Sequence, residues 1–142
     1  MTRLAGLVAG LVLMAGAAVA DEIGHTVSDL AAYEARVDQM SGQYSAILVG
    51  IRADWCAFCQ VIQADILPEL LAHGHLRDIG LIKIDVTAAD DDVAEILTHL
   101  SVWGPPTYFL VDGHGQELPD SRVIGPFTVD DMAERLARVR SE

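Results

Sequence analysis

The 142-residue chain carries 21 Asp and Glu residues against nine Lys and Arg residues, which gives a formal net charge of −12. This acidic balance argues against binding to nucleic acid or to anionic membrane surfaces, and its simplest role is solubility. Hydrophobic residues make up 51% of the sequence. A chain of this length and composition can bury a core of its own as a single domain, so it does not need cysteines as structural staples.

The first twenty residues have the pattern of an export signal. Arg3 supplies a short positive start, an apolar segment runs from Leu4 to Met14, and Ala18-Val19-Ala20 matches the small-x-small cleavage pattern. An uncleaved membrane anchor is the alternative, although the apolar run is short for a membrane span. We therefore expect a signal peptide at residues 1–20 and one domain at residues 21–142, located in a bacterial periplasm, where disulfides can persist.

Hydrophobic periodicity predicts four helices and four strands in the remainder of the chain. In chain order these are a helix at Ser28–Met40, a strand at Ala46–Ile51, a helix from Ala57 to about His73, a strand at Leu81–Val86, a helix at Asp90–Leu100, strands at Thr107–Val111 and Arg122–Ile124, and a helix at Val129–Arg140. Ser28 is the expected N-cap of the first helix. Pro68 should kink the second helix, and Gly80 should punctuate the chain before the second strand.

These elements alternate in a way that predicts an α/β fold. Helices between strands imply parallel pairing, whereas the Gly-rich turn at Asp112–Gly115 implies an antiparallel hairpin. A small mixed sheet with helices on both faces satisfies both requirements.

The only two cysteines of the chain, Cys56 and Cys59, follow the first predicted strand and open a helix. A Cys-x-x-Cys pair at such a junction is the arrangement that thiol–disulfide exchange needs. Unpaired backbone N–H groups at the helix start would stabilise a thiolate on Cys56, and Cys59 would lie one turn on, within bonding reach. The Cys56 thiolate would attack the disulfide of a partner, and Cys59 would resolve the resulting mixed disulfide.

Three simpler interpretations of the cysteine pair stay open. Two more ligands, for which His73 and His75 are candidates, would be needed for a zinc site. A purely structural disulfide would close only a tiny loop and would restrain the unfolded chain little. Two inert core thiols are the third alternative, although a Trp-Cys pair at a helix start is not a typical core position.

The element order and the motifs together resemble the thioredoxin superfamily, and most of all the C-terminal periplasmic thioredoxin-like domain of the thiol:disulfide interchange protein DsbD. The likeness runs from about Ile47 to Leu136 and implies a thioredoxin-like fold. Six segments of the sequence match the family pattern: Ala53-Asp54-Trp55-Cys56 with Cys59, Ile84-Asp85-Val86-Thr87-Ala88, His99-Leu100, Gly104-Pro105-Pro106-Thr107, Asp112-Gly113-His114-Gly115-Gln116-Glu117 and Arg122-Val123-Ile124-Gly125.

This resemblance implies a role for each matching residue. Cys56 corresponds to the exposed nucleophile and Cys59 to the buried resolving thiol. Trp55 corresponds to the aromatic side chain that shields the site. Pro106 matches the cis-proline that packs beside the cysteines and shapes the edge where a peptide docks, with an ordinary turn proline as the alternative. Gly125 matches the glycine opposite the disulfide, where a side chain would obstruct the partner, with a plain strand-end glycine as the alternative.

Two acidic positions of the family are neutral in this sequence. Thioredoxins usually place a buried acid six residues before the first cysteine, where Gly50 stands, and the DsbD-type domain has a second acid where Gln63 stands. With less negative charge to oppose the thiolate, we expect a lower pKa for Cys56 than in acid-bearing relatives. Arg52 would tune that pKa further if it points toward the cysteines, whereas the alternative is a solvated arginine paired with Asp54.

Pro105 is the third position at which this sequence differs from the family pattern. The residue before the cis-proline normally offers a backbone N–H to the incoming peptide, and proline has none. We therefore expect weaker or narrower peptide recognition than in a general thioredoxin. Trp103 either borders the site or serves as a packing aromatic. The histidines show no catalytic pattern and are expected at the surface; they are His25, His73, His75, His99 and His114.

Together these features predict a periplasmic thiol–disulfide oxidoreductase that reduces disulfides of exported proteins or relays electrons. No cofactor beyond the Cys56–Cys59 disulfide and no metal is expected. The expected partners are thiols and disulfides of exported proteins and a membrane electron donor, with no nucleic acid, and the chain is expected to be a monomer. The alternatives are a disulfide oxidase or isomerase, which the missing acids and Arg52 favour, and a non-enzymatic thioredoxin-fold binding module.

Overall fold

The computed structural model of the chain describes residues 23–141. The expected signal peptide at residues 1–20, with its cleavage site, lies outside the described residues. In chain order the elements are β1 (His25–Val27), α1 (Leu30–Met40), β2 (Ala46–Arg52), α2 (Ala57–Val61), the π-helical turn η2 (Ile62–Ile66), α3 (Leu67–Ala72), β3 (Ile79–Asp85), α4 (Asp91–His99), β4 (Thr107–Val111), β5 (Val123–Ile124) and α5 (Val129–Ser141). Within residues 23–141, no helix has both the length and the apolar character needed to cross a membrane.

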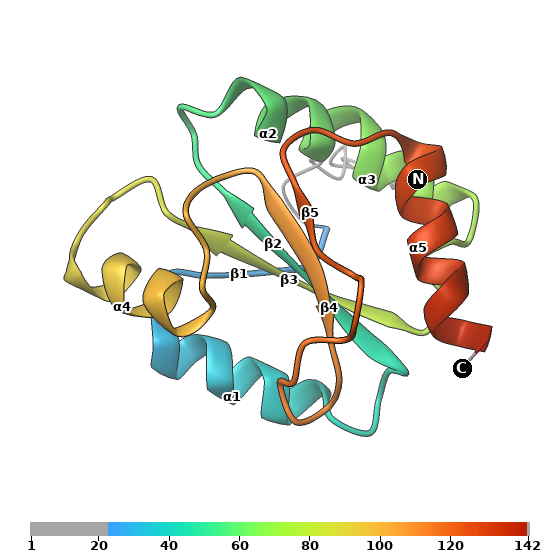
Figure 1. The fold of residues 1–142 in the computed structure, drawn as a ribbon, viewed down its shortest axis with the longest axis horizontal. Coiled ribbons are helices and arrows are strands. Elements are labelled where there is room, and N and C mark those ends of the chain that lie inside the picture. Colours follow the sequence, from blue (N-terminus) through green and yellow to red (C-terminus); the bar gives the residue numbers. More distant parts are fainter. Residues whose placement is uncertain (1–22, 142) are drawn as a thin grey trace, which may run out of the picture.

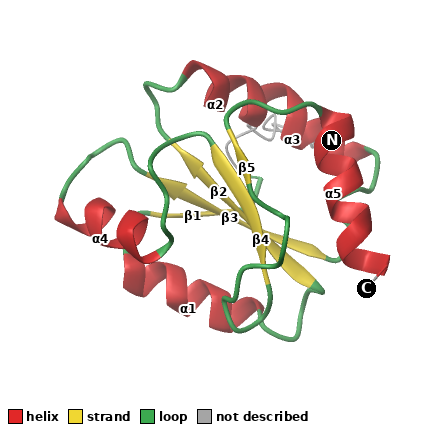
Figure 2. Cartoon of the chain, viewed as in Figure 1, coloured by secondary structure: helices red, strands yellow, loops and turns green. Residues whose placement is uncertain are grey.

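The five strands form one mixed sheet in the order β1-β3-β2-β4-β5. β1 and β2 run parallel to β3, whereas β4 runs antiparallel to β2 and β5 runs antiparallel to β4. Helices α1 and α4 cover one face of the sheet, and α2, α3 and α5 cover the other (Figure 1). The predicted α/β class, a small mixed sheet with helices on both faces, is thus confirmed (Figure 2).

The central strand β2 is buried on both faces because its side chains alternate between two cores. Ile47, Val49 and Ile51 belong to the core beneath α1 and α4. Ala46 and Leu48 belong to the core beneath α3 and α5. This burial on both sides anchors the carboxyl end of β2, from which the cysteine loop departs.

Several details of the sequence-based expectation are wrong. The short strand β1 was not predicted, because three residues are too few to show an alternating pattern. The N-cap of α1 is Asp29 rather than Ser28, since the Asp29 carboxylate accepts a hydrogen bond of 2.8 Å from the backbone N–H of Ala32. Gly80 does not punctuate the chain but lies inside β3, where an added Cβ would stand 3.0 Å from the ring of Tyr44.

The predicted long helix after the cysteines is present but is not uniform. It consists of α2, η2 and α3 in direct succession, and the backbone N–H of Leu67 donates to the carbonyl of Ile62, five residues earlier. Pro68 lies in the first turn of α3, where a missing N–H group leaves no helical hydrogen bond unmade. The irregularity is therefore a π-helical turn before Pro68, and it carries the buried side chains of Ile62 and Gln63 against the sheet.

Candidate functional site

A disulfide joins Cys56 and Cys59 at the start of α2, with the two Cα atoms 5.2 Å apart. Cys56 is the N-cap of α2, and its Sγ accepts a hydrogen bond of 3.2 Å from the backbone N–H of Cys59. The same N–H group would stabilise a thiolate on Cys56 after reduction. The helix start thus supplies the donor that the sequence pattern predicted.

The expected exposure of Cys56 is wrong for this disulfide-bonded state. Cys56 is 7% exposed and Cys59 is 3% exposed, so both are buried. Both cysteines pack in the same core cluster as Ile51 and Ala53. Because both cysteines are disulfide-bonded, the alternative of two free core thiols is also wrong. Among residues 23–141, no group of three or more His, Cys, Asp or Glu side chains could hold a metal ion.

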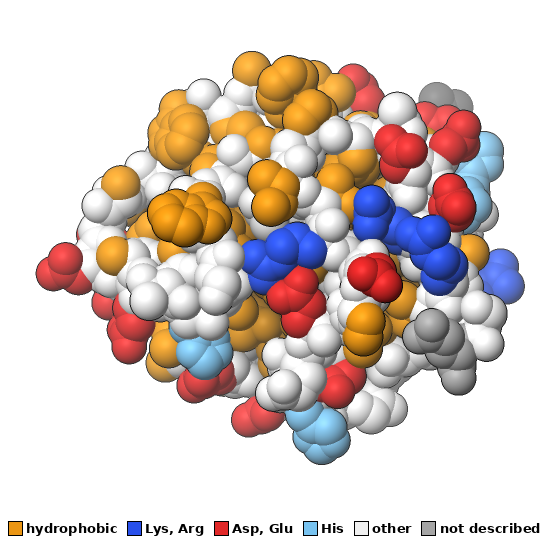
Figure 3. All heavy atoms as spheres, in the orientation of Figure 1, with side chains coloured by type: hydrophobic (Ala, Val, Ile, Leu, Met, Phe, Trp, Pro, Cys, Tyr) orange, Lys and Arg blue, Asp and Glu red, His pale blue; other side chains and the backbone are white. Residues whose placement is uncertain are grey.

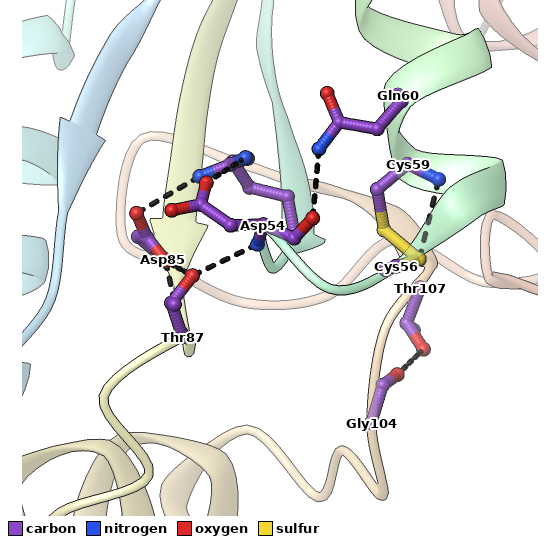
Figure 4. Close-up of a disulfide and its surroundings, with 9 residues drawn as sticks. Asp54, Cys56, Cys59, Gln60, Asp85, Thr87, Gly104 and Thr107 are labelled. Carbon is purple, nitrogen blue, oxygen red and sulfur yellow. Dashed lines mark hydrogen bonds and ion pairs between the residues drawn. A yellow bond between two sulfur atoms is a disulfide. The ribbon is translucent and has the colours of Figure 1, made fainter.

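The proline loop that precedes β4 lies next to the cysteine loop. The Pro105–Pro106 peptide bond is cis, as the family resemblance implies. Thr107, the first residue of β4, pairs with Ile51 near the end of β2 and donates its hydroxyl hydrogen bond to the carbonyl of Gly104 at 2.7 Å (Figure 4). The sheet register therefore holds the proline loop beside the strand end from which the cysteines depart.

Gly125 follows β5 and donates its backbone N–H to the carbonyl of Pro106 at 2.9 Å. Its φ of +91° lies in the region that favours glycine, and an added Cβ would meet nothing within 4 Å. The backbone conformation is thus one reason for glycine at this position. The predicted second reason, room for a docking partner, stays a prediction, and the space in front of Gly125 is open.

Exposed hydrophobic side chains surround the two loops. Trp55 is 65% exposed and Trp103 is 98% exposed, so the interpretation of Trp103 as a packing aromatic is wrong. Phe58, Val61 and Ile124 are also exposed, at 56%, 48% and 74%. The space-filling view shows hydrophobic side chains gathered on the part of the surface above α2 and the adjoining loops (Figure 3). We call these five residues the apolar rim; sequence analysis identified its two tryptophans and missed the other three.

Two carboxylates hold the guanidinium of Arg52, and its role in tuning the Cys56 pKa stays a prediction. Its guanidinium forms ion pairs of 2.7 Å with Asp54 and 2.9 Å with Asp85, so the expected pair with Asp54 is present, but the side chain is only 17% exposed and is not solvated. Burial alone would raise the pKa of Asp85, but hydrogen bonds from Thr87 and the charge of Arg52 outweigh it and lower that pKa. Thr87 also accepts a hydrogen bond of 2.9 Å from the backbone N–H of Asp54. This network fixes the backbone just before the cysteines.

The layer beneath α2 contains polar groups that sequence analysis missed. Gly50 is paired with Tyr108 on one side and with Lys83 on the other. Tyr108 is 2% exposed, and burial raises the pKa of its hydroxyl. Lys83 is also 2% exposed and donates a hydrogen bond of 3.3 Å from Nζ to Oε1 of Gln63. The signal available in the sequence was a single lysine between isoleucines in the predicted strand Leu81–Val86, whose only other polar residue is Asp85 near its end.

The histidines lie away from the disulfide loop in sequence and share no contact with it among the described interactions. His73 and His75 are near one another, with ring centroids 6.3 Å apart, and His73 lies 3.8 Å from the Glu69 carboxylate. Burial and the charge of Arg36 lower the pKa of His25. None of these contacts supports a catalytic role.

Comparison with known proteins finds DsbD repeatedly. The thiol:disulfide interchange protein DsbD of Tatumella citrea is 31% identical over 117 residues, which are 82% of this chain and 19% of that protein. DsbD of Escherichia coli K12 is 35% identical over 79 residues, which are 56% of this chain and 14% of that protein. The chain thus spans about a fifth or less of the length of these curated relatives. No protein-family model matches the chain.

The solved structures that are similar to this chain include the C-terminal domain of DsbD. The C-terminal domain of Neisseria meningitidis DsbD superposes with a TM-score of 0.68 in the oxidised form, at 24% identity, covering 81% of this chain and 99% of the domain. The reduced form gives a TM-score of 0.66 at 26% identity, covering 80% and 98%. A mutant thioredoxin from Halobacterium salinarum shares the fold, with a TM-score of 0.62 at 21% identity and coverage of 82% and 89%. The chain therefore belongs to the thioredoxin superfamily and is similar in sequence and fold to the C-terminal domain of DsbD.

Proposed function

We propose that the chain is a thiol–disulfide oxidoreductase of the periplasm, which reduces disulfides of exported proteins or relays electrons between redox partners. The observation that carries this proposal is the Cys56–Cys59 disulfide at the start of α2, within a fold shared with the DsbD C-terminal domain. The curated relatives bear the name thiol:disulfide interchange protein. The proposed periplasmic location depends on the export-signal pattern of residues 1–20.

In the reducing direction, the chain starts as the dithiol. The Cys56 thiolate attacks one sulfur of the partner's disulfide, forms a mixed disulfide and expels the other partner sulfur as a thiolate, which takes a proton from water. Cys59 then loses its proton and attacks Cys56, so that the intramolecular disulfide forms as the mixed disulfide breaks. The partner gains two electrons and two protons, and the chain loses them. The Cys56–Cys59 dithiol carries the two electrons itself, so the proposed exchange requires no other cofactor.

The apolar rim supports docking of a protein rather than a small thiol. Exposed aromatic and aliphatic side chains near a buried reactive pair provide a surface that a partner can cover and keep dry. The partners that we propose are thiols and disulfides of exported proteins, together with a membrane electron donor that returns the disulfide to the dithiol. A monomeric chain that binds no nucleic acid agrees with the net charge of −12.

A disulfide oxidase or isomerase is the second candidate, and one observation favours it. Neither position at which relatives carry an acid beneath the cysteines holds a carboxylate here, because Gly50 and Gln63 stand there. Less negative charge stabilises the thiolate and therefore the reduced form, which makes the disulfide a stronger oxidant. The equilibrium redox potential separates the candidates: about −270 mV, as in thioredoxin, indicates a reductant, and about −120 mV indicates an oxidant.

The test of the proposed function uses the chain without residues 1–20, with a protein disulfide such as that of insulin as substrate. Dithiothreitol supplies the electrons, and the rate of disulfide reduction above the uncatalysed rate is measured. We expect the Cys56→Ser variant to abolish catalysis, and the Cys59→Ser variant to accumulate a mixed disulfide with the substrate. If Cys56→Ser retains the function of the wild type, the chain is a binding module and the proposal is wrong.

A further inference from the structure

Arg122 is fixed by hydrogen bonds to two other segments of the chain. Its guanidinium holds both carboxylate oxygens of Glu117, through Nε at 2.9 Å and through Nη2 at 2.7 Å. It also donates to the backbone carbonyls of Leu100, from Nη2, and of Ser101, from Nη1, each at 2.8 Å. Four of the five guanidinium N–H groups are thus engaged. An ordinary surface ion pair does not need so many directed contacts, which points to a more specific role.

The rest of the Arg122 environment gives those donors a rigid base. Cζ of Arg122 lies 4.6 Å from the ring centroid of Phe109, which is 1% exposed in the middle of β4. The contact with the Phe109 ring and the two bonds to Glu117 together fix the plane of the guanidinium. The N–H groups that point at Leu100 and Ser101 are therefore preorganised.

The two carbonyls that Arg122 holds lie where α4 ends and the proline loop (residues 102–106) begins. Leu100 is the C-cap of α4, and carbonyls at a helix C-terminus lack helical donors and attract a positive charge. Ser101 has a φ of +54°, in the left-handed region that residues other than glycine seldom adopt. Val102 is buried, whereas the side chain of Trp103 is 98% exposed. Trp103 is therefore positioned by the backbone that carries it, and Arg122 holds that backbone two residues earlier.

The segment that carries Arg122 also holds the far end of the proline loop. β5, which follows Arg122 directly, pairs with the first two residues of β4. Gly125, which follows β5 directly, donates its backbone N–H to the carbonyl of Pro106 at 2.9 Å. The loop between these contacts contains Trp103 of the apolar rim and the cis peptide bond before Pro106. A side chain at the start of the loop and a backbone group at its end thus clamp the loop beside the disulfide.

We propose that Arg122 is a positioning residue for the docking of protein partners, because it holds the proline loop where Trp103 and Pro106 can meet a partner at the disulfide. This inference rests on the proposed function and identifies a residue that acts on recognition through the loop. Without the guanidinium, the loop would become ordered only when a partner binds, and that ordering would weaken binding. None of the hydrogen bonds or ion pairs described for Arg122 involves a cysteine, so exchange at the Cys56–Cys59 pair should be unchanged.

The first test compares Arg122→Gln with the wild type in the reduction of insulin and of glutathione disulfide. We expect the KM for insulin to rise about three- to tenfold with a similar kcat, since ordering of the loop opposes binding rather than the chemical step. The rate with glutathione disulfide and the redox potential of the cysteine pair should stay at the wild-type values. An insulin KM equal to that of the wild type overturns the inference, and so does an equal loss with glutathione disulfide.

Arg140→Gln is the matched control for loss of an arginine. Arg140 also donates to two backbone carbonyls, those of His75 and Arg77. These residues precede β3, whose first residue pairs with the first residue of β2, so they lie at the end of the sheet opposite to the cysteines. We expect Arg140→Gln to leave the KM for insulin unchanged, even if the melting temperature falls. An equal rise in KM for both variants would assign the effect to lost stability and overturn the inference.

A second readout needs no substrate. In 15N relaxation of the oxidised protein, the backbone amide of Trp103 should have an order parameter of about 0.85 in the wild type and below about 0.6 in Arg122→Gln. The amide of Trp55, in the cysteine loop, should keep its value in both proteins. A Trp103 amide that is equally ordered in the two proteins overturns the inference. This outcome is independent of insulin reduction, whose absence in the wild type would overturn the proposed function.

A milder variant keeps the inference testable if Arg122→Gln does not fold. Arg122→Lys keeps the charge but loses the planar fork, so it cannot bind Glu117 through two bonds and also reach both carbonyls. We expect the KM for insulin to rise about two- to fivefold. In a Trp103→Ala background this rise should be smaller, because the loop no longer carries the side chain that the arginine positions. A wild-type KM for Arg122→Lys, or the same rise in both backgrounds, contradicts the proposed role.

Discussion

Gly50 and Tyr108 are paired across β2 and β4, and the Tyr108 ring occupies the space that a side chain at position 50 would need. A Cβ added to Gly50 would lie 2.9 Å from the Tyr108 hydroxyl oxygen and closer still to two carbons of the ring. The ring is held in place by edge-on packing against Phe127, with centroids 5.1 Å apart. A carboxylate at position 50 is therefore incompatible with the present position of Tyr108.

The Gly50→Asp substitution, which restores the acid of relatives, should destabilise this chain. Overpacking against Tyr108 alone accounts for about 1–3 kcal/mol of unfolding free energy, and a buried carboxylate adds to it. Thermal unfolding of the oxidised protein should show a melting temperature lower by roughly 4 °C or more for each kcal/mol. Gly50→Ala is the matched control for the steric part and should lose less. A Gly50→Asp protein as stable as the wild type would contradict this account of the glycine.

Loss of the Arg52 guanidinium should affect stability more than redox chemistry. Arg52→Ala removes the partly buried pair with Asp85, so we expect a loss of about 1–3 kcal/mol in urea unfolding at pH 7. Arg138→Ala is the control, since the Arg138–Glu134 pair is exposed and should contribute about 0.3–0.5 kcal/mol. The redox potential of Arg52→Ala should stay close to that of the wild type. A large change in potential would revive the role in tuning the cysteines.

The same contacts predict how stability depends on acid pH. The folded-state pKa of Asp85 is lowered, so its contribution to stability is full above its unfolded-state value of about 3.9 and is lost as pH falls through the folded-state value. Wild-type unfolding free energy should therefore fall below about pH 4. Arg52→Ala should show a shallower fall, which urea unfolding at several pH values between 2.5 and 7 would measure. Parallel curves for the two proteins would contradict the assigned cause.

The sequence was sufficient to predict the long elements and the cysteine site, and the reasons are local. Amphipathic periodicity marks helices such as α4 and α5, and Cys-x-x-Cys with Pro106-Thr107 marks the two loops that meet at the site. The pairing of Arg52 with Asp85 could not be predicted, because Asp85 is 33 residues away and is placed by sheet register. The Lys83–Gln63 contact was missed for the same reason, since it joins a strand to a helix 20 residues earlier.

Trp103 should contribute to recognition of protein substrates and little to folding. Its side chain is 98% exposed, so Trp103→Ala removes almost no packing within the chain. We expect a melting temperature near the wild-type value, together with a severalfold lower kcat/KM for insulin and an unchanged rate with glutathione disulfide. Leu71→Ala provides the control, because Leu71 is 54% exposed and lies near the end of α3, far along the helical run from Cys56. Equal effects of the two variants would count against a docking role for Trp103.

Pro105 should limit peptide recognition because it has no N–H to donate to an incoming strand. Pro105→Ile supplies that donor, and one hydrogen bond contributes about 0.5–1.5 kcal/mol. We therefore expect kcat/KM for a peptide disulfide to rise by about two- to tenfold. Exchange with glutathione disulfide, which does not add as a strand, should be unaffected. The idea fails if peptide turnover by Pro105→Ile equals that of the wild type.

The Cys56 thiol should ionise below the pH at which an ordinary cysteine does. Its sulfur accepts the backbone N–H of Cys59 at 3.2 Å, and Gly50 and Gln63 supply no negative charge where relatives carry acids. Both features favour the thiolate. Iodoacetamide alkylation of the reduced protein, followed against pH, should give a midpoint clearly below about 8.5, the value for a free thiol. Gln63→Glu should raise that midpoint, because it restores one negative charge. A wild-type midpoint at or above the free-thiol value would rule out the proposed activation of Cys56.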